Sequence, residues 1–250
     1  MILLDRVSYR YNEKQETSFK LKEVSFSCRK GLINGVIGAN GSGKSTIARL
    51  IAGLIQPRSG SVTVDGLAAF NNGAGARFLA GIIFQTPENQ IVGTTVAEDI
   101  AFGLENLGVP RPEMRQRVYN IAEKFELNDM LDVPVHCLSG GQKQMLCVAS
   151  VMVMEPSWLI FDEPTSHLDP WTRKIFWKKI RGLVAAEKTG VLVVSQLPDD
   201  MAHFEQIFAF ESGELVFSGS KNELKEKAEQ LPWFNLPEAW RLEKLLGTKK

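Results

Sequence analysis

The sequence predicts an α/β fold that contains a helical insertion. The run GANGSGKST, residues 38–46, stands between a strand-length apolar run and a helical pattern. A second apolar run, WLIF, ends at the acidic pair Asp162 and Glu163. From about residue 94 to 154 the apolar residues follow helical spacing, and α/β patterning resumes after them. This order indicates a β-rich start, an α/β core and an inserted helical part.

Most of the predicted strands lie before the insertion. MILLDRVSY, LKEVSFSC and LINGVIG have the length and apolar clustering of strands. STIARLIAGL follows the glycine loop and places Ile47, Leu50, Ile51 and Leu54 at helical spacing. SGSVTVDG and GIIF are then expected as strands bounded by turns.

Three helices are predicted for the insertion. Thr95 and Glu98 form a capping box before the first helix. RPEMRQRVYNIAEKFEL and SGGQKQMLCVASVMVM supply the second and the third. The α/β pattern returns with the strand SWLIF, the helix DPWTRKIFWKKIRGLVAAE and the strand VLVVS. FEQIFAFESGELVFSGS predicts a terminal hairpin that turns at Ser212 and Gly213.

Composition limits the classes of function. The chain has 250 residues, 44% of them apolar, which is enough for one large domain with a core. Its 29 basic and 29 acidic residues cancel, which argues against a nucleic-acid binder. MLCVASVMVM is too short to span a bilayer, and MILLDRVSYR lacks the layout of a signal peptide. Cys28, Cys137 and Cys147 are expected to be reduced core residues of a cytosolic protein.

The glycine run has the spacing of a phosphate-binding loop, Gly38-x4-Gly43-Lys44-Ser45. Between a strand and a helix, its backbone N–H groups can converge on phosphate oxygens. Glycine is needed because a Cβ would block that approach. Lys44 is expected to reach the β and γ phosphates, and Ser45 to bind Mg²⁺. The predicted nucleotide-binding loop comprises Gly38, Ala39, Asn40, Gly41, Ser42, Gly43, Lys44, Ser45 and Thr46.

Hydrolysis of the nucleotide also needs acidic residues in addition to the glycine loop. The strand WLIF buries itself and presents Asp162 and Glu163 at its C-terminal end. We expect Asp162 to hold the magnesium ion through its water shell and Glu163 to polarise the attacking water. The two acids and the glycine loop together predict ATP hydrolysis with Mg²⁺ as the metal.

The motif LSGGQKQ, residues 138–144, resembles the signature of the ATP-binding cassette (ABC) ATPases. The resemblance covers about residues 1–220 and implies a P-loop NTPase core with an antiparallel β subdomain and an inserted α-helical subdomain, about 86–156. It also implies that the signature binds the ATP held by a second ABC ATPase subunit, so that the chain works as a dimer. The signature residues are Leu138, Ser139, Gly140, Gly141 and Gln142.

Other residues match the same family in order. Gln85 resembles the glutamine that senses magnesium and the attacking water. Asp169, in SHLD, resembles the loop that crosses the dimer interface. Tyr11 resembles the aromatic residue that stacks on adenine, and Tyr9 is its rival. Tyr9 shares a strand with core residues, so we favour Tyr11.

A narrower resemblance concerns FQTPENQIVGTTVAEDIAFGLENLGVP, residues 84–110, which is similar to the ATPases of energy-coupling factor (ECF) transporters. These take up vitamins or transition-metal ions such as cobalt and nickel, and another type of ABC importer is the alternative. The resemblance implies a membrane-embedded coupling subunit, a substrate-binding membrane subunit and a peripheral place on the cytoplasmic face of the membrane. Pro87 keeps Thr86 out of the helical region, which predicts an extended segment after it. The coupling residues are expected to be Pro87, Asn89, Gln90, Ile91 and Val92.

The sequence departs from the family at Gln196. The family usually places a histidine there, after the strand that follows the catalytic glutamate. A glutamine amide donates hydrogen bonds but cannot become cationic or pass a proton as imidazole can. We therefore expect a site that binds ATP and hydrolyses it slowly, with Glu163, Gln85 and Gln196 as its catalytic set. A heterodimer is favoured over a homodimer.

The chain divides into an ATPase domain, 1–230, and an amphipathic tail, 231–250. The tail is either a dimer-contacting arm or a helix folded back on its own domain, begun by Pro237. Two other functions stay open: a non-transport ABC ATPase of translation or DNA repair, and a regulator with slow turnover. Against the first, the chain has one cassette and no long coiled coil.

Overall fold

Ten strands in two sheets form the centre of the computed structural model, which describes residues 1–11, 20–70, 79–185, 189–227, 237 and 240. One sheet has the order β2-β1-β4-β5 and the other β10-β9-β3-β8-β7-β6. The strands are β1 (Ile2–Arg10), β2 (Lys20–Cys28), β3 (Ile33–Gly38), β4 (Ser59–Val64), β5 (Leu67–Ala68), β6 (Ala80–Ile83), β7 (Trp158–Asp162), β8 (Gly190–Ser195), β9 (Gln206–Glu211) and β10 (Glu214–Ser220).

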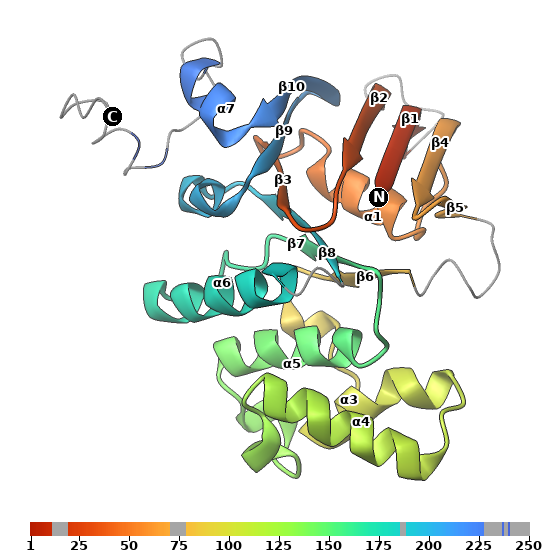
Figure 1. Ribbon diagram of the computed structural model, residues 1–250, viewed down its shortest axis with the longest axis vertical. Coiled ribbons are helices and arrows are strands. Elements are labelled where there is room, and N and C mark those ends of the chain that lie inside the picture. The colour runs from red at the N-terminus through yellow and green to blue at the C-terminus, as the bar shows by residue number, and fades with distance from the viewer. Residues whose placement is uncertain (12–19, 71–78, 186–188, 228–236, 238–239, 241–250) are drawn as a thin grey trace.

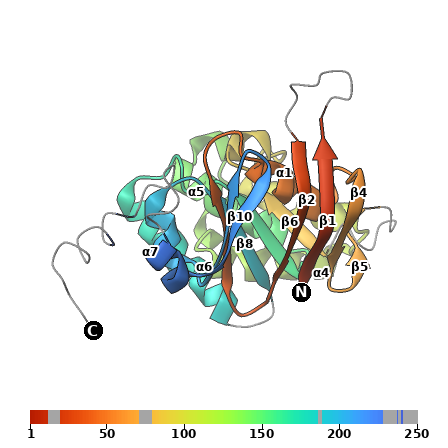
Figure 2. The ribbon, with the colours of Figure 1, turned by 90° about the horizontal axis from the view of Figure 1, so that it is seen from above.

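Helices cover the six-stranded sheet. In Figure 1, α5 and α6 lie on one side of it, α1 and the four-stranded sheet lie on the other, and α3 and α4 pack beyond α5. Figure 2 shows the four-stranded sheet at the opposite side of the molecule from α6 and α7. The helices are α1 (Lys44–Ile51), α3 (Val96–Asn106), α4 (Arg111–Lys124), α5 (Gly140–Met152), α6 (Pro170–Ala185) and α7 (Lys221–Lys227).

Strand β7, which lies between β8 and the edge strand β6, is buried on both faces. Leu159 and Phe161 join the larger core with α5 and α6, whereas Trp158 and Ile160 join the smaller core with α1. This alternation follows the two-residue period of a strand. Each such side chain stabilises the fold by about 1.5–3 kcal/mol when fully buried. The strand can therefore carry the buried Asp162 at its end.

Parallel pairing places the strand ends that matter for function together. β3, β6, β7, β8 and β9 pair in parallel, and only β10 runs antiparallel in this sheet. The carboxyl ends of β3, β7 and β8, at Gly38, Asp162 and Ser195, thus lie at one edge of the sheet. Ligands of open α/β sheets bind outside this edge.

The predicted α/β fold, the Thr95–Glu98 capping box and the Ser212–Gly213 hairpin turn are confirmed. The prediction for Leu54 was wrong: α1 ends at Ile51, Gly53 has φ +67°, and Leu54 is 53% exposed. The helix is followed by a turn that requires glycine, because a Cβ at Gly53 would lie 2.2 Å from the backbone oxygen of Ala69.

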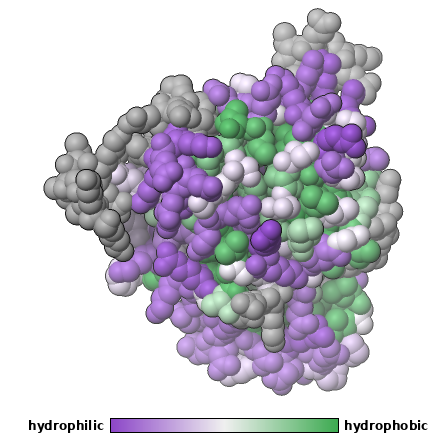
Figure 3. Space-filling view, turned by 45° about the horizontal axis from the view of Figure 1, so that its top comes forward, coloured by the Kyte–Doolittle hydropathy of each residue, from purple (hydrophilic) through white to green (hydrophobic). Residues whose placement is uncertain are grey.

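Cys28 and Cys147 are buried as expected, but Cys137 is exposed, because it lies in the short turn before α5. Within the described residues, no helix has both the length and the apolar composition needed to cross a membrane. On the face drawn in Figure 3, hydrophilic residues predominate and hydrophobic ones form separate patches between them.

Candidate functional site

The loop after β3 is shaped by its glycines. Gly41 and Gly43 have φ values of +77° and +108°, in the left-handed region that other residues rarely adopt. At Gly38 a Cβ would lie 2.3 Å from the carbonyl oxygen of Phe210 on β9. The backbone of the loop therefore stays close to the sheet, and its N–H groups are not shielded by side chains.

The start of α1 has the features of an anion site. The first-turn N–H groups of a helix lack intrahelical partners, and no acidic residue lies in the first turn of α1. Lys44 is buried, and its Nζ donates to the carbonyl oxygens of Gly38 and Ala39 at 2.9 and 3.0 Å. Burial lowers the pKa of Lys44, and the nearby Glu163 and Asp162 oppose that shift.

A cavity of about 230 Å³ opens over this helix end. Among the described residues, the buried hydroxyl of Ser42 in the same loop has no hydrogen-bond partner. An unpaired buried hydroxyl and a glycine cradle fit the oxygen-rich phosphates of a nucleotide. The cavity is lined by Tyr11, Asn40, Gly41, Gly43, Lys44, Ser45, Thr46 and Glu163.

Ser45 and Asp162 form an oxygen pair beside the cavity. The Ser45 hydroxyl donates to Asp162 Oδ1 at 2.9 Å, which joins the start of α1 to the end of β7. Burial raises the pKa of Asp162, and the Ser45 hydrogen bond opposes that shift. A hydroxyl and a carboxylate are hard oxygen donors, the kind that Mg²⁺ prefers. The two residues therefore fit a magnesium ion.

Glu163 lines the cavity and has a constrained backbone conformation. Its φ is +52°, and its N–H donates to the carbonyl oxygen of Val194 on β8 at 2.8 Å. A non-glycine residue in this region costs on the order of 1–3 kcal/mol and is typical of functional sites. Burial raises the pKa of Glu163, whereas the positive charge of Lys44 lowers it.

Two glutamines meet the Glu163 carboxylate. Gln196 Nε2 donates to Glu163 Oε2 at 3.0 Å, and Gln85 Nε2 donates to the same oxygen at 3.3 Å. Gln85 Nε2 also lies 3.4 Å from the hydroxyl of Ser166, a residue that the sequence interpretation did not include. The structure thus brings together the loop, both acids and both glutamines from four separate segments.

Tyr11 lies at the cavity and Tyr9 behind it. The Tyr11 hydroxyl is 3.2 Å from Thr46 Oγ1 and accepts from Arg49 Nη1 at 3.1 Å. Tyr9 meets Tyr11 edge to face, with ring centroids 5.0 Å apart, and packs against the smaller core. Of the two rings, only that of Tyr11 lines the cavity.

The signature residues stand at the start of α5, away from the cavity. Ser139 and Gln142 form a reciprocal capping box, and Leu138 is buried. Gly141 faces α6, where its Cβ would lie 2.5 Å from Thr172 Cγ2. Asp169 caps α6 by accepting from the N–H of Trp171 at 2.9 Å. None of these residues lines the 230 Å³ cavity.

The segment after Gln85 differs from the extended form that the sequence suggested. Thr86 is extended as expected, but Pro87–Asn89 form a 3-10 helix and Gln90 is helical. Gln90 turns inward, accepting from the N–H of Phe84 at 3.0 Å and donating to the carbonyl oxygen of Ile82 at 3.2 Å. The amide pairs with backbone groups in the edge strand β6 and directly after it, which no local pattern reveals.

The remainder of this segment divides between core and surface. Ile91 packs against the larger core, Asn89 is exposed, and Val92 is 59% exposed. Sequence reasoning missed Asp99, a buried residue of α3. Its Oδ1 accepts from the N–H of Val92 at 2.8 Å, and its Oδ2 accepts from Ser150 of α5 at 2.6 Å.

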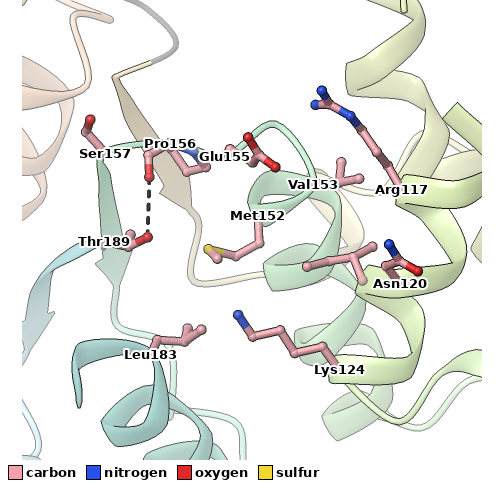
Figure 4. Close-up of a pocket in the computed structure, with 11 residues that line it drawn as sticks. Arg117, Asn120, Lys124, Met152, Val153, Glu155, Pro156, Ser157, Leu183 and Thr189 are labelled. Atoms are coloured by element: carbon pink, nitrogen blue, oxygen red, sulfur yellow. Dashed lines mark hydrogen bonds between the residues drawn. The ribbon is translucent and has the colours of Figure 1, made fainter. Parts of the chain in front are cut away.

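A larger cavity, about 470 Å³, lies between α4, the end of α5 and the start of β7 (Figure 4). Lys124 points its amine into it, and Thr189 bonds to the Pro156 carbonyl at 3.5 Å on its far wall. It adjoins the amino ends of β7 and β8, opposite the edge where α/β sheets bind ligands. None of the predicted site residues lines it.

Of the predicted tail, the described residues include only Pro237 and Trp240, and the rest of that prediction lies outside them. Trp240 is buried in the larger core, and its N–H donates to the Pro237 carbonyl at 3.0 Å. Lys225 Nζ lies 4.9 Å from the centre of the Trp240 ring. At Trp240 the chain thus packs on its own domain.

Comparison with known proteins reveals the family. The ABC transporter family model matches residues 21–166. An energy-coupling factor transporter ATP-binding protein of Mycoplasma mobile is 37% identical over 98% of this chain and 90% of its own length. Another, from Halalkalibacterium halodurans, is 39% identical over 88% and 78%.

Solved structures agree with these relatives. The structure of cbiO1 from Clostridium perfringens, part of the ABC transporter complex cbiONQ, superposes with a TM-score of 0.82 at 29% identity. The superposition covers 97% of this chain and 98% of that one. The chain therefore belongs to the ABC transporter family, as an ATP-binding ATPase subunit with the α/β fold of that family.

Proposed function

We propose that this chain is the ATP-hydrolysing subunit of an ECF-type importer. The observation that carries the proposal is one cavity lined by Lys44 and Glu163, with Asp162 bonded to Ser45 of the same cavity wall. The relatives named as energy-coupling factor transporter ATP-binding proteins support the ECF assignment. The transported substrate in this proposal is a vitamin or a transition-metal ion, and it is selected by another subunit.

The residues divide the chemistry as follows. The N–H groups of the loop and Lys44 hold the phosphates, and Tyr11 stacks on the adenine. Ser45 and Asp162 hold Mg²⁺, which supplies Lewis acidity toward the phosphate oxygens, and Gln85 senses it. A water oxygen bonds to the γ phosphorus, the bond to the bridging oxygen of ADP breaks, and Glu163 accepts the proton of the water. Gln85 and Gln196 orient the Glu163 carboxylate through their amides.

The active form in this proposal is a dimer. The signature residues of a chain lie outside the cavity of the same chain, so a second subunit supplies the signature that closes it. Asp169 then stands at the subunit interface. We favour a heterodimer, because Gln196 cannot take up a proton and suits a slow site paired with a faster one.

Coupling to the membrane runs through the segment after Gln85. Val92 and Asn89 are exposed there, and an apolar groove of about 420 Å³ lies beside the edge strand β6. The groove is lined by Leu54, Phe70, Ile82 and Met154 among others. We assign it to an apolar helix of the membrane-embedded coupling subunit, which sets the chain on the cytoplasmic face of the membrane. The similarity to cbiO1, which is part of the ABC transporter complex cbiONQ, supports such an assembly.

Reconstitution tests the proposal. The chain is combined in vesicles with candidate coupling, substrate-binding and second ATPase subunits, and uptake and ATPase activity are measured. Glu163→Gln is expected to lower the rate of ATP hydrolysis at this chain's own site by about 10²–10⁴ and to retain ATP binding. ATPase activity that no membrane partner stimulates would contradict the importer function.

Gln196 supports one second candidate, a nucleotide-binding regulator with slow turnover. ATPase activity measured with and without the candidate membrane partners separates this regulator from the importer. Gln196→His then tests for unequal sites in the reconstituted pair. A rate that rises with the histidine supports the unequal sites. If the rate does not rise, and Glu163→Gln costs as much as the equivalent change in the partner, the sites are equal and the slow-site idea fails.

A further inference from the structure

Asp200 is a fully buried carboxylate that lies behind the site and touches none of the cavity. It sits in a short 3-10 helix, Pro198–His203, that follows β8. Its Oδ2 accepts from Thr165 Oγ1 at 2.6 Å and from Ser195 Oγ at 2.7 Å. Its Oδ1 accepts from the indole of Trp177 on α6 at 3.1 Å.

In these hydrogen bonds the partners donate and the Asp200 carboxylate accepts. The Trp177 indole can only donate. The hydroxyl of Ser195 accepts from the N–H of Leu197 at 3.0 Å, so its own proton is directed to Asp200. An ionised carboxylate accepts from all three donors at once, whereas an asparagine amide offers one oxygen and two donors. The pattern therefore fits a carboxylate.

The charge that faces this carboxylate comes from α6. The guanidinium of Arg173 lies 3.5 Å from the Thr165 carbonyl oxygen and 3.4 Å from that of Leu168. Burial raises the pKa of Asp200, and the three hydrogen bonds and then the charge of Arg173 oppose that shift. The donors and Arg173 therefore offset part of the cost of burying the charge.

The partners of Asp200 stand next to the residues proposed to act on ATP. Thr165 follows Glu163 by two positions, and Ser195 directly precedes Gln196. The backbone of Glu163 has a positive φ, which persists only when surrounding residues fix it. Gln196 Nε2 must also stay 3.0 Å from the Glu163 carboxylate to donate its hydrogen bond. One carboxylate thus fixes both loops relative to each other and to α6.

We propose that Asp200 is a positioning residue for ATP hydrolysis. It ties the loop of Glu163 to the loop of Gln196 and so sets the distance between the two side chains. This inference rests on the proposed roles of Glu163 and Gln196.

The test compares four variants of the full chain under the conditions in which the wild type hydrolyses ATP. Asp200→Asn is expected to lower kcat at least tenfold while the KM for ATP changes less than twofold. Thr165→Val and Ser195→Ala each remove one hydrogen bond to Asp200 and are expected to lower kcat several-fold with little change in the KM for ATP. Trp177→Phe, the matched control, removes the third hydrogen bond. It is expected to lower the melting temperature but to keep kcat.

Several results of this comparison would overturn the positioning role of Asp200. The proposal is overturned if Asp200→Asn retains as much kcat as Trp177→Phe, or if KM rises in step with the fall in kcat. Should Asp200→Asn fail to fold, wild-type kcat in both Thr165→Val and Ser195→Ala overturns it. Glu163→Gln runs in parallel: if it too keeps its kcat, the proposed site is wrong, and not merely the role of Asp200.

Discussion

Gln196 donates a hydrogen bond from Nε2 to Glu163 Oε2 across 3.0 Å, and Gln85 donates to the same oxygen from 3.3 Å. Two neutral amides therefore stabilise the ionised form of a carboxylate that burial pushes toward its protonated form. Because a general base must be ionised to accept a proton, the acidic limb of the pH–rate profile reports on this contact.

Replacement of Gln196 by methionine is expected to move that acidic limb to higher pH. The hydrogen bond from Gln196 lowers the pKa of Glu163, so its removal raises the pKa further above its ordinary value. The carboxylate then becomes protonated at a higher pH as the solution is acidified. The measurement is kcat from pH 5 to 9 for both proteins. An acidic limb at the same pH in both would show that Gln196 does not act on Glu163.

Tyr11→Ala is expected to weaken ATP binding about tenfold or more, because a base stacked on an aromatic ring gains about 1–3 kcal/mol. Tyr11→Phe keeps the ring and should bind nearly as well as the wild type. Tyr9→Ala is the matched control, because the Tyr9 ring packs against the core. This variant should have a lower melting temperature than the wild type and nearly the same affinity for ATP. The affinities are measured by calorimetric titration with ATP. If Tyr9→Ala weakens binding and Tyr11→Ala does not, the adenine contact belongs to Tyr9.

Asp99→Ala is expected to uncouple the proposed membrane contact from hydrolysis. The Asp99 carboxylate holds the backbone of Val92 and joins it to Ser150 on the helix that begins at the signature. Without it the exposed segment loses its fixed attachment to α5. Stimulation of ATPase activity by the coupling subunit should fall several-fold, and unstimulated activity should stay within twofold.

Ser150→Ala is the control for this change, because it removes one of the bonds to Asp99 and leaves the backbone contacts in place. It should lose less stimulation than Asp99→Ala. Equal stimulation of the wild type and Asp99→Ala by the coupling subunit would rule out a coupling role for the Asp99 hydrogen bonds.

His203 is expected to make the fold sensitive to acid. It stacks on Trp177, with ring centroids 4.4 Å apart, and lies 2.7 Å from Arg181 Nη2. Burial, Arg181 and Lys221 lower the pKa of His203 from 6.5 to about 4. As the pH falls from 6.5 to 4, the unfolded chain binds a proton that the folded chain does not, so stability is lost in that window.

His203→Phe keeps a ring against Trp177 and removes this titration. The urea midpoint of unfolding should therefore fall less between pH 7 and pH 5 in the variant than in the wild type. A constant difference between the two midpoints across that range would contradict the assignment.

Features that depend on near neighbours in the chain could be predicted from the sequence. The Thr95–Glu98 capping box spans one helical turn, and the Ser212–Gly213 turn joins two adjacent strands. Lys44 and Ser45 were assigned from a local motif, and the carboxyl-edge position of Asp162 followed from one apolar run. The structure places these three residues at the same strand edge and helix start.

Features that depend on distant partners could not be predicted. Asp200 ends the run LPDD, and the partners that bury it, Thr165, Ser195 and Trp177, are brought to it by the fold. Gln90 turns inward because two backbone groups need partners: the carbonyl oxygen of Ile82 in the edge strand β6, and the N–H of Phe84 directly after that strand.

The central claim is that main-chain amides near Lys44 hold the triphosphate of MgATP and that a second subunit completes the site. A crystal structure of Glu163→Gln with MgATP, together with its second ATPase subunit, tests it most directly. The account predicts phosphate oxygens within hydrogen-bond distance of the N–H groups of Gly41, Gly43 and Lys44, and a signature motif from the other subunit against the same nucleotide. Phosphates bound elsewhere, or a nucleotide enclosed by one chain alone, would contradict it.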